Sequence, residues 1–79
     1  MGREEIRAKI QELLREVTDD ESAAVTDETT AEDVSGWDST NHVRLMVALE
    51  AAFNIRFETD EIAAPETVGE LISLIQGKL

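Results

Sequence analysis

Three residues whose side chains can do chemistry lie close together near the middle of the chain: Asp38, Ser39 and His42, the only histidine. A serine nucleophile needs a base that reaches its oxygen, a third group that orients the base, and donors that stabilise the oxyanion. Asp38 precedes the helix expected here, and the residues around Ser39 do not match a nucleophile elbow. We therefore expect no catalytic residue and no enzymatic activity, and we interpret His42 as a partly exposed interface residue.

Ser39 lies where a helix is expected to begin, and this position suits a phosphate. Gly36 favours a turn, and both Asp38 and Ser39 are of types that cap helix N-termini. The first backbone N–H groups of a helix lack intrahelical acceptors, and the helix dipole stabilises a negative charge there by about 0.3 to 1 kcal/mol. The residues therefore favour a phosphorylated or phospho-linked serine.

The helix after Ser39 is predicted to span about residues 39–53 and to lie at the centre of the fold. Its apolar residues sweep an arc of roughly 200° at 100° per residue. They are Val43, Leu45, Met46, Val47, Leu49 and Phe53. Because so wide an apolar surface cannot face water, we expect this helix to be covered from more than one side.

Three further helices are expected around it, and no segment alternates with a period of two residues, so the predicted class is all-α. Their predicted ranges are about 3–17, 59–64 and 67–76. Thr67 and Glu70 form a capping-box pattern that begins the last helix, and Gly77 is expected to end it.

The third helix is short, and we expect Thr59 or Asp60 to begin it and Pro65 to limit it. Such an element has a low opening energy, so it is the expected gate of the bundle. The segment between the first two helices is expected to be a long loop, in which Thr29 and Glu32 cap a short turn. The apolar residues expected to pin this loop are Ala23, Ala24, Val25, Ala31 and Val34.

The pair Asp38-Ser39, the helix VRLMVALEAAF and the apolar exit Ile55-Arg56-Phe57 together resemble the modification site and second helix of acyl carrier proteins. The resemblance extends over essentially the whole chain, including the closing TVGELISLI. It implies a single carrier domain, residues 1–79, folded as a four-helix bundle of acyl-carrier type.

In that family a serine in an Asp-Ser-Leu motif is esterified with 4′-phosphopantetheine from coenzyme A, and the terminal thiol carries acyl groups as thioesters. The resemblance implies Ser39 as the attachment residue, with Asp38 and Trp37 beside it. The chain has no cysteine, so any acting thiol has to come from a prosthetic group. Trp37 is expected to pack the long loop onto the central helix, while a contact with the pantetheine arm stays open.

Four residues depart from the family pattern: Thr40 replaces the usual Leu, Asn41 a common acid, and Arg44 and Ala51 the Glu of fatty-acid carriers. These departures point to a specialised member in a lipid or secondary-metabolite pathway. Partner docking is expected on Thr40, Asn41, Arg44, Val47, Glu50 and Ala51. The implied partners are a phosphopantetheinyl transferase and acyl-loading and acyl-transfer enzymes with basic docking surfaces.

An apolar cargo is expected to fold back between the central helix and the short third one. The predicted pocket residues are Val43, Met46, Leu49, Phe53, Phe57, Ile62 and Val68. Two alternatives remain: an aminoacyl or peptidyl carrier domain, and an acidic helical interaction module that is never modified.

A formal net charge of −11 disfavours nucleic acid as a partner, because its phosphates repel an acidic protein. No apolar run approaches the roughly 20 residues of a membrane-spanning helix, and the N-terminus lacks the apolar core of a signal peptide. The acidic clusters lack the ligand spacing and turn glycine of a calcium loop, so no metal is expected. These features predict a cytoplasmic monomer.

Overall fold

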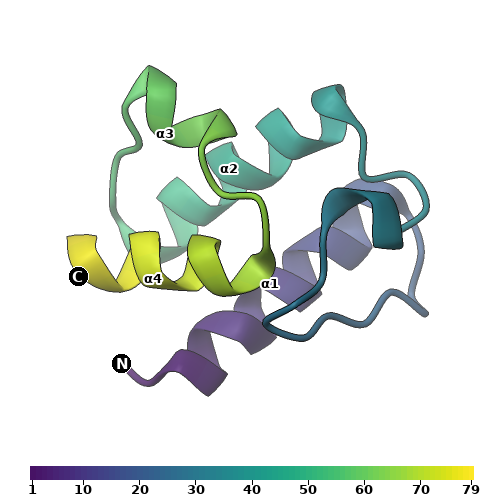
Figure 1. Ribbon diagram of the computed structural model, residues 1–79, viewed down its shortest axis with the longest axis horizontal. Helices are drawn as coiled ribbons and strands as arrows, with labels where there is room; N and C mark the ends of the chain where they lie inside the picture. The colour runs from purple at the N-terminus through teal and green to yellow at the C-terminus, as the bar shows by residue number, and fades with distance from the viewer.

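The computed structural model describes all 79 residues and consists of α-helices with no strand (Figure 1). The helices are α1 (Arg3–Thr18), α2 (Ser39–Phe53), α3 (Thr59–Ala63) and α4 (Val68–Lys78), and a 3₁₀ turn, η1 (Ala31–Asp33), lies between α1 and α2. The predicted all-α class, with a long first loop and a short third helix, is confirmed. No helix is both long and apolar enough to cross a membrane.

The core lies where α1, α2 and α4 meet. Each of these helices presents apolar residues at three- and four-residue spacing, which gathers them on one face. The side chains that are almost completely buried are Ile6, Ile10, Leu14, Leu45, Met46, Leu49, Val68, Leu71, Ile72 and Ile75. Burying one such side chain stabilises the fold by about 1.5 to 3 kcal/mol, so these three helices form the stable part of the molecule.

α2 is less covered than its apolar pattern predicts. Leu45, Met46 and Leu49 are buried, but Val43 is 49% and Val47 is 58% exposed. α1 packs along the buried face, whereas α3 has only five residues and contains no buried one. The expected cover from more than one side therefore does not extend over the whole apolar arc, because Val43 and Val47 stay exposed.

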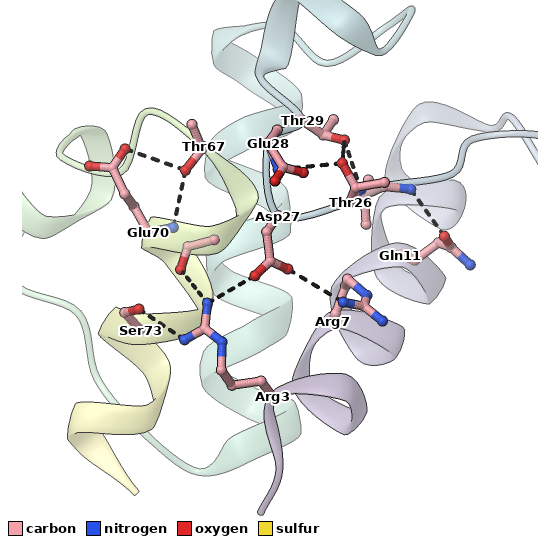
Figure 2. A network of polar contacts seen from close by, with 12 residues as sticks. Arg3, Arg7, Gln11, Thr26, Asp27, Glu28, Thr29, Thr67, Glu70 and Ser73 are labelled. Carbon is pink, nitrogen blue, oxygen red and sulfur yellow. Dashed lines mark hydrogen bonds and ion pairs between the residues drawn. The ribbon is translucent and has the colours of Figure 1, made fainter.

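The loop between α1 and α2 is tied to both α1 and α4 by polar contacts around Asp27 (Figure 2). The Asp27 carboxylate accepts from Arg3 at 3.2 Å and from Arg7 at 3.4 Å, and its backbone carbonyl accepts from the Gly69 N–H at 2.9 Å. Arg3 also donates to the Ser73 hydroxyl and to the Gly69 carbonyl. A Cβ on residue 69 would lie 2.9 Å from the Asp27 carbonyl oxygen, so the close approach requires glycine. We call Arg3, Arg7, Asp27 and Gly69 the Asp27 anchor.

Further contacts hold the loop on either side of this anchor. The Val25 N–H donates to the Gln11 side chain at 3.1 Å, and the Val68 N–H donates to the Thr29 carbonyl at 2.9 Å. Among the residues expected to pin the loop, Ala23, Val25 and Val34 are buried, whereas Ala24 and Ala31 are exposed. The loop is thus held by backbone and side-chain polar bonds as well as by its apolar residues.

The short turn in this loop begins one residue later than predicted. Thr30 caps η1 and forms the box with Asp33, whose carboxylate accepts from the Thr30 N–H at 2.9 Å. The expected cap, Thr29, is buried, and its hydroxyl accepts from the Thr26 N–H at 2.8 Å. The pairing of Thr29 with Glu32 is therefore wrong, because the Thr29 hydroxyl already has a partner within the loop.

α3 begins at Thr59, one of the two residues expected to begin it, and its cap is the residue before. Its N-cap is Glu58, whose N–H donates to the Glu61 carboxylate at 2.7 Å, so neither Thr59 nor Asp60 caps it. Glu61 also pairs with Lys78 of α4 at 2.8 Å. The same carboxylate therefore begins α3 and ties it to α4.

At α4 one predicted end is confirmed and the other is not. The Thr67 hydroxyl caps the helix by accepting from the Glu70 N–H at 3.2 Å, while the Glu70 carboxylate accepts from the Glu66 N–H at 3.3 Å and does not return to the Thr67 N–H. Gly77 lies inside the helix, which continues to Lys78. Glycine ends a helix by taking the left-handed conformation, and Gly77 does not take it, since its φ is not positive.

Candidate functional site

Ser39 is the first residue of α2, and its side chain is exposed. Asp38 is the N-cap: its carboxylate accepts from the Asn41 N–H at 2.8 Å, and its carbonyl accepts from the His42 N–H at 2.8 Å. The bond to His42 is the first intrahelical bond, and the bond from Asn41 satisfies one of the four N-terminal donors that lack such a partner. The N–H groups of Ser39 and Thr40 keep no intrahelical acceptor. An exposed hydroxyl therefore lies beside unpaired backbone donors.

The turn in front of Ser39 is fixed by local contacts. Gly36 adopts a φ of 85°, in the region that favours glycine. The Asn41 side chain donates to the Gly36 carbonyl at 2.8 Å and so ties the first turn of α2 back to this loop. Ser39 consequently has a defined position at the helix end.

Trp37, His42 and Ile62 form a hydrogen-bonded bridge from the loop through α2 to α3. The Trp37 indole Nε1–H donates to His42 Nδ1 at 3.0 Å, and the two rings stack with centroids 6.0 Å apart and planes 28° apart. His42 Nε2 lies 2.6 Å from the Ile62 carbonyl oxygen. Because an indole N–H can only donate, Nδ1 must accept, so the proton is on Nε2, which donates to Ile62.

This bridge changes the interpretation of His42. Both ring nitrogens have partners inside the molecule, so neither is available as a base for Ser39. His42 is half-buried, and its role as an interface residue stays a prediction. The geometry gives no support to a serine hydrolase site.

A cleft of about 460 Å³ opens next to Ser39. One wall is formed by the loop, one by the start of α2, and one by α3 and the residues after it. The lining residues are Ala31, Trp37, Asp38, Ser39, His42, Val43, Ile62, Ala63 and Pro65. The volume lies within the range of small-ligand sites, about 300 to 1,000 Å³. Trp37, only 9% exposed, therefore both packs the loop onto α2 and forms part of the cleft wall.

The residues predicted to line a cargo pocket are divided between this cleft and the core. Val43 and Ile62 line the cleft. Met46, Leu49 and Val68 are almost completely buried in the packed core, and Phe53 and Phe57 are partly buried against it. The structure therefore brings two of the predicted residues next to Ser39, whereas three are enclosed in the core and two lie partly exposed at its edge.

The residues predicted to dock partners also differ in their surroundings. Thr40, Arg44, Val47 and Ala51 are exposed on α2. Asn41 holds the Gly36 turn, as described, and Glu50 accepts from the Phe57 N–H at 2.8 Å, so the side chains of Asn41 and Glu50 stabilise the fold.

Asp38 is the one acidic or basic residue among those that line the cleft, apart from the hydrogen-bonded His42. Outside this lining, Arg44 makes no ion pair, and the backbone N–H of Glu58 and the Lys78 side chain lower the pKa of the Glu61 carboxyl on α3. No cluster of three or more His, Asp or Glu side chains is arranged to hold a metal ion. The cleft therefore has polar and apolar surfaces without a strong cation site.

The bridge through His42 is the functional feature that sequence reasoning missed. The spacing of Trp37 and His42 brings an indole and an imidazole to the first turn of α2, and this local signal was available. The bond to α3 could not be predicted, because its acceptor is a backbone carbonyl 20 residues away, and every residue has such a carbonyl.

The residues at this end of α2 fit a phosphopantetheine group on Ser39. The hydroxyl is accessible, two backbone donors of the helix are free to face a phosphate, and the adjoining cleft offers Trp37, Val43 and Ile62 as contact surfaces.

Comparisons with known proteins agree with this fit. A family model described as "Phosphopantetheine attachment site" matches residues 6–75. The chain is similar to an acyl carrier protein of Thermotoga maritima, at 31% identity over 78 residues, which cover 99% of this chain and 96% of that protein. It is also similar to the meromycolate extension acyl carrier protein of Mycobacterium tuberculosis, at 33% identity over 73 residues, which cover 92% of this chain and 64% of that protein.

A solved structure extends the likeness to three dimensions. The solution structure of a holo acyl carrier protein from Geobacter metallireducens matches with a TM-score of 0.80 and 37% identity, over 90% of this chain and 82% of that one.

Proposed function

The chain belongs to the acyl carrier protein family, and on this premise we propose that Ser39 is the residue that bears its 4′-phosphopantetheine group. When bound, this group supplies a terminal thiol that holds acyl groups as thioesters. The observation that carries the proposal is the position of Ser39: exposed, first in α2, and next to the cleft.

The neighbouring residues prepare this position. Ser39 Oγ would bear the phosphate of this group, and the free N–H groups of Ser39 and Thr40 would stabilise the negative charge of that phosphate by about 0.3 to 1 kcal/mol. Asp38 and Asn41 fix the first turn, so the hydroxyl is presented at one place to a modifying enzyme.

Docking of the phosphopantetheinyl transferase and the acyl-handling enzymes is assigned to the exposed side of α2. Thr40, Arg44, Val47 and Ala51 follow one another at intervals of four, three and four residues, and they therefore form one stripe along the helix. We call these four residues the docking stripe. Val47 supplies apolar contact, and the unpaired cation of Arg44 discriminates between partners.

The carrier itself performs no chemistry on the cargo, because the imidazole at the site is occupied by structural bonds. Arg44 and Ala51 stand where fatty-acid carriers tend to have Glu, so the docking stripe is less acidic than theirs. This difference supports a role in a specialised lipid or secondary-metabolite pathway. Cargo is expected first in the cleft against Val43 and Ile62, and to reach Met46, Leu49 and Val68 only when α3 moves away.

Attachment is tested with a phosphopantetheinyl transferase, coenzyme A and intact-mass measurement. The wild-type chain should gain one phosphopantetheinyl group, and Ser39→Ala should gain none. Ser35→Ala is the matched control, because Ser35 is an exposed serine just before the same helix, and it should load as the wild type does. A mass gain on Ser39→Ala would rule out the assigned residue, and no gain on the wild type would reject the carrier function.

A further inference from the structure

The cleft beside Ser39 has walls from separate parts of the chain, and one side chain connects them. Trp37 belongs to the loop wall and Ile62 to the α3 wall, and His42 makes a hydrogen bond to each. The spacing of the two walls therefore depends on this imidazole.

α3 has few other attachments. The bond from His42 to the Ile62 carbonyl is the only hydrogen bond between α2 and α3, and none of the residues of α3 is buried. On the side of α4, the pair of Glu61 with Lys78 holds the helix, and the Phe57 N–H donates to Glu50 just before it. Of these contacts, only the His42 bond lies at the cleft.

We propose that His42 determines the length of acyl group that the carrier shelters, by clamping α3 through the Ile62 carbonyl. The inference rests on the proposed attachment at Ser39 and names the class of cargo: short acyl groups lie in the cleft, and long ones stay outside.

The physical reason is the packing behind the cleft. Leu49 and Val68 have no exposed surface and Met46 is 1% exposed, so the core offers no space for a longer chain. Space arises only if α3 moves away from α2, and that movement breaks the bond between His42 Nε2 and the Ile62 carbonyl. Two polar groups in a partly buried place then lose their partner, which opposes the movement.

Two substitutions separate the bonds of the imidazole. In His42→Asn the amide oxygen replaces Nδ1 as the acceptor for Trp37, but no donor reaches Ile62. In His42→Gln the amide N–H replaces Nε2 as the donor to Ile62, but the acceptor for Trp37 is lost. Both variants place an amide at the same site, so a general loss of packing affects them equally.

The first measurement is amide hydrogen exchange in α3 of the unmodified protein. We expect exchange in His42→Asn to be roughly tenfold faster than in His42→Gln and the wild type, as the loss of one hydrogen bond implies. Equal exchange in the two variants would overturn the clamp. This result does not depend on loading at Ser39.

The second measurement uses the loaded protein with a series of saturated acyl groups of increasing length. The thermal midpoint of the wild type and His42→Gln should stop rising after the short members, whereas that of His42→Asn should continue to rise, because a ligand held by the folded state raises it. A midpoint that rises throughout the series in the wild type, or that follows one profile in both variants, would contradict the inference. Intact mass confirms loading beforehand, so a failure of attachment is seen separately.

Discussion

The loop between α1 and α2 and the segment that contains α3 both have little regular structure, yet they are held in different ways. The loop is tied to α1 and α4 by the Asp27 anchor and by backbone bonds from Val25 and Val68. α3 is tied by one hydrogen bond to His42 and one ion pair with Lys78. Both regions border the cleft, and α3 has fewer polar contacts with the rest of the molecule than the loop has.

This difference matches what a carrier needs from the two regions. The loop leads directly into Ser39, so a fixed loop keeps the proposed attachment residue in one place. α3 lies across the cleft from the loop, and a weakly attached wall is able to move without unfolding the core. The two regions are therefore expected to respond differently to substitutions.

The largest effect on stability should come from a substitution at Gly69, where α4 contacts the loop between α1 and α2. Gly69→Ala places a Cβ 2.9 Å from the Asp27 carbonyl oxygen, so backbone has to shift. We expect a loss of about 1 to 3 kcal/mol in the free energy of unfolding, measured by urea denaturation.

Gly77→Ala is the matched control for this substitution, because it lies in the same helix and nothing is within 4 Å of its Cβ position. It should be neutral or stabilise by up to about 1 kcal/mol, as alanine is the better helix former. Similar losses in both variants would show that the contact with Asp27 is not the cause.

A smaller loss of stability is expected when the backbone contact between residues 27 and 69 stays and only the charge of Asp27 is removed. Asp27→Asn removes the carboxylate that accepts from Arg3 and Arg7, and should cost about 1 kcal/mol, because both pairs are partly exposed. Glu12→Gln, which removes the partner of Lys9 on the surface of α1, should change stability by less than about 0.5 kcal/mol. If the two substitutions cost the same, the anchor would be no stronger than an ordinary surface pair.

Acid should loosen α3 and leave the core intact. Bonds from the Glu58 N–H and Lys78 lower the folded-state pKa of Glu61, so its contribution is present above the unfolded pKa and is lost as the pH falls through the lowered value. Protection of the α3 amides against hydrogen exchange, corrected for the intrinsic rate at each pH, should therefore fall with acid in the wild type while that of the core amides of α1 and α4 does not.

Glu61→Gln should reproduce the loosened α3 at neutral pH and remove its further response to acid. An acid response of α3 that persists in this variant would have to come from another group, and Glu61 would lose its assigned role.

The smallest effect on stability is expected from substitutions in the docking stripe, which belongs neither to the loop nor to α3. Arg44 is exposed and unpaired, so Arg44→Glu should change the free energy of unfolding by less than about 0.5 kcal/mol. The same change should speed acyl transfer with generic fatty-acid enzymes by roughly tenfold at low salt, and less at high salt. Slower transfer with every such enzyme would remove Arg44 as a discriminating residue.

The local patterns of the sequence predicted most of the helices and the position of Ser39. Asp38 caps α2 and Thr67 caps α4 through bonds that span only three residues, and such bonds depend on residue types that the sequence displays. The apolar pattern of α2 misled in one respect, because Val43 and Val47 are apolar yet about half exposed. Periodicity shows which side chains are apolar, but the length of the neighbouring helix decides which of them are buried.

The contacts that hold the molecule together from distant positions were not predictable. Arg3 and Asp27 are 24 residues apart, and His42 and the Ile62 carbonyl are 20 apart. Neither pair follows a helical or strand period, so residue types alone do not single it out. The Asp27 anchor and the His42 bridge therefore appear only when the fold is known.

The stacking of Trp37 on His42 has a practical consequence for observing this carrier. The chain contains a single indole, and that indole lies in the wall next to Ser39. The wavelength and intensity of tryptophan fluorescence depend on exposure of the indole to water and on the neighbouring imidazole. Attachment of the arm, arrival of cargo and displacement of α3 should therefore each change the fluorescence of Trp37. The protein thus contains an intrinsic optical reporter at its working end, and kinetics with each partner enzyme can be followed without a label.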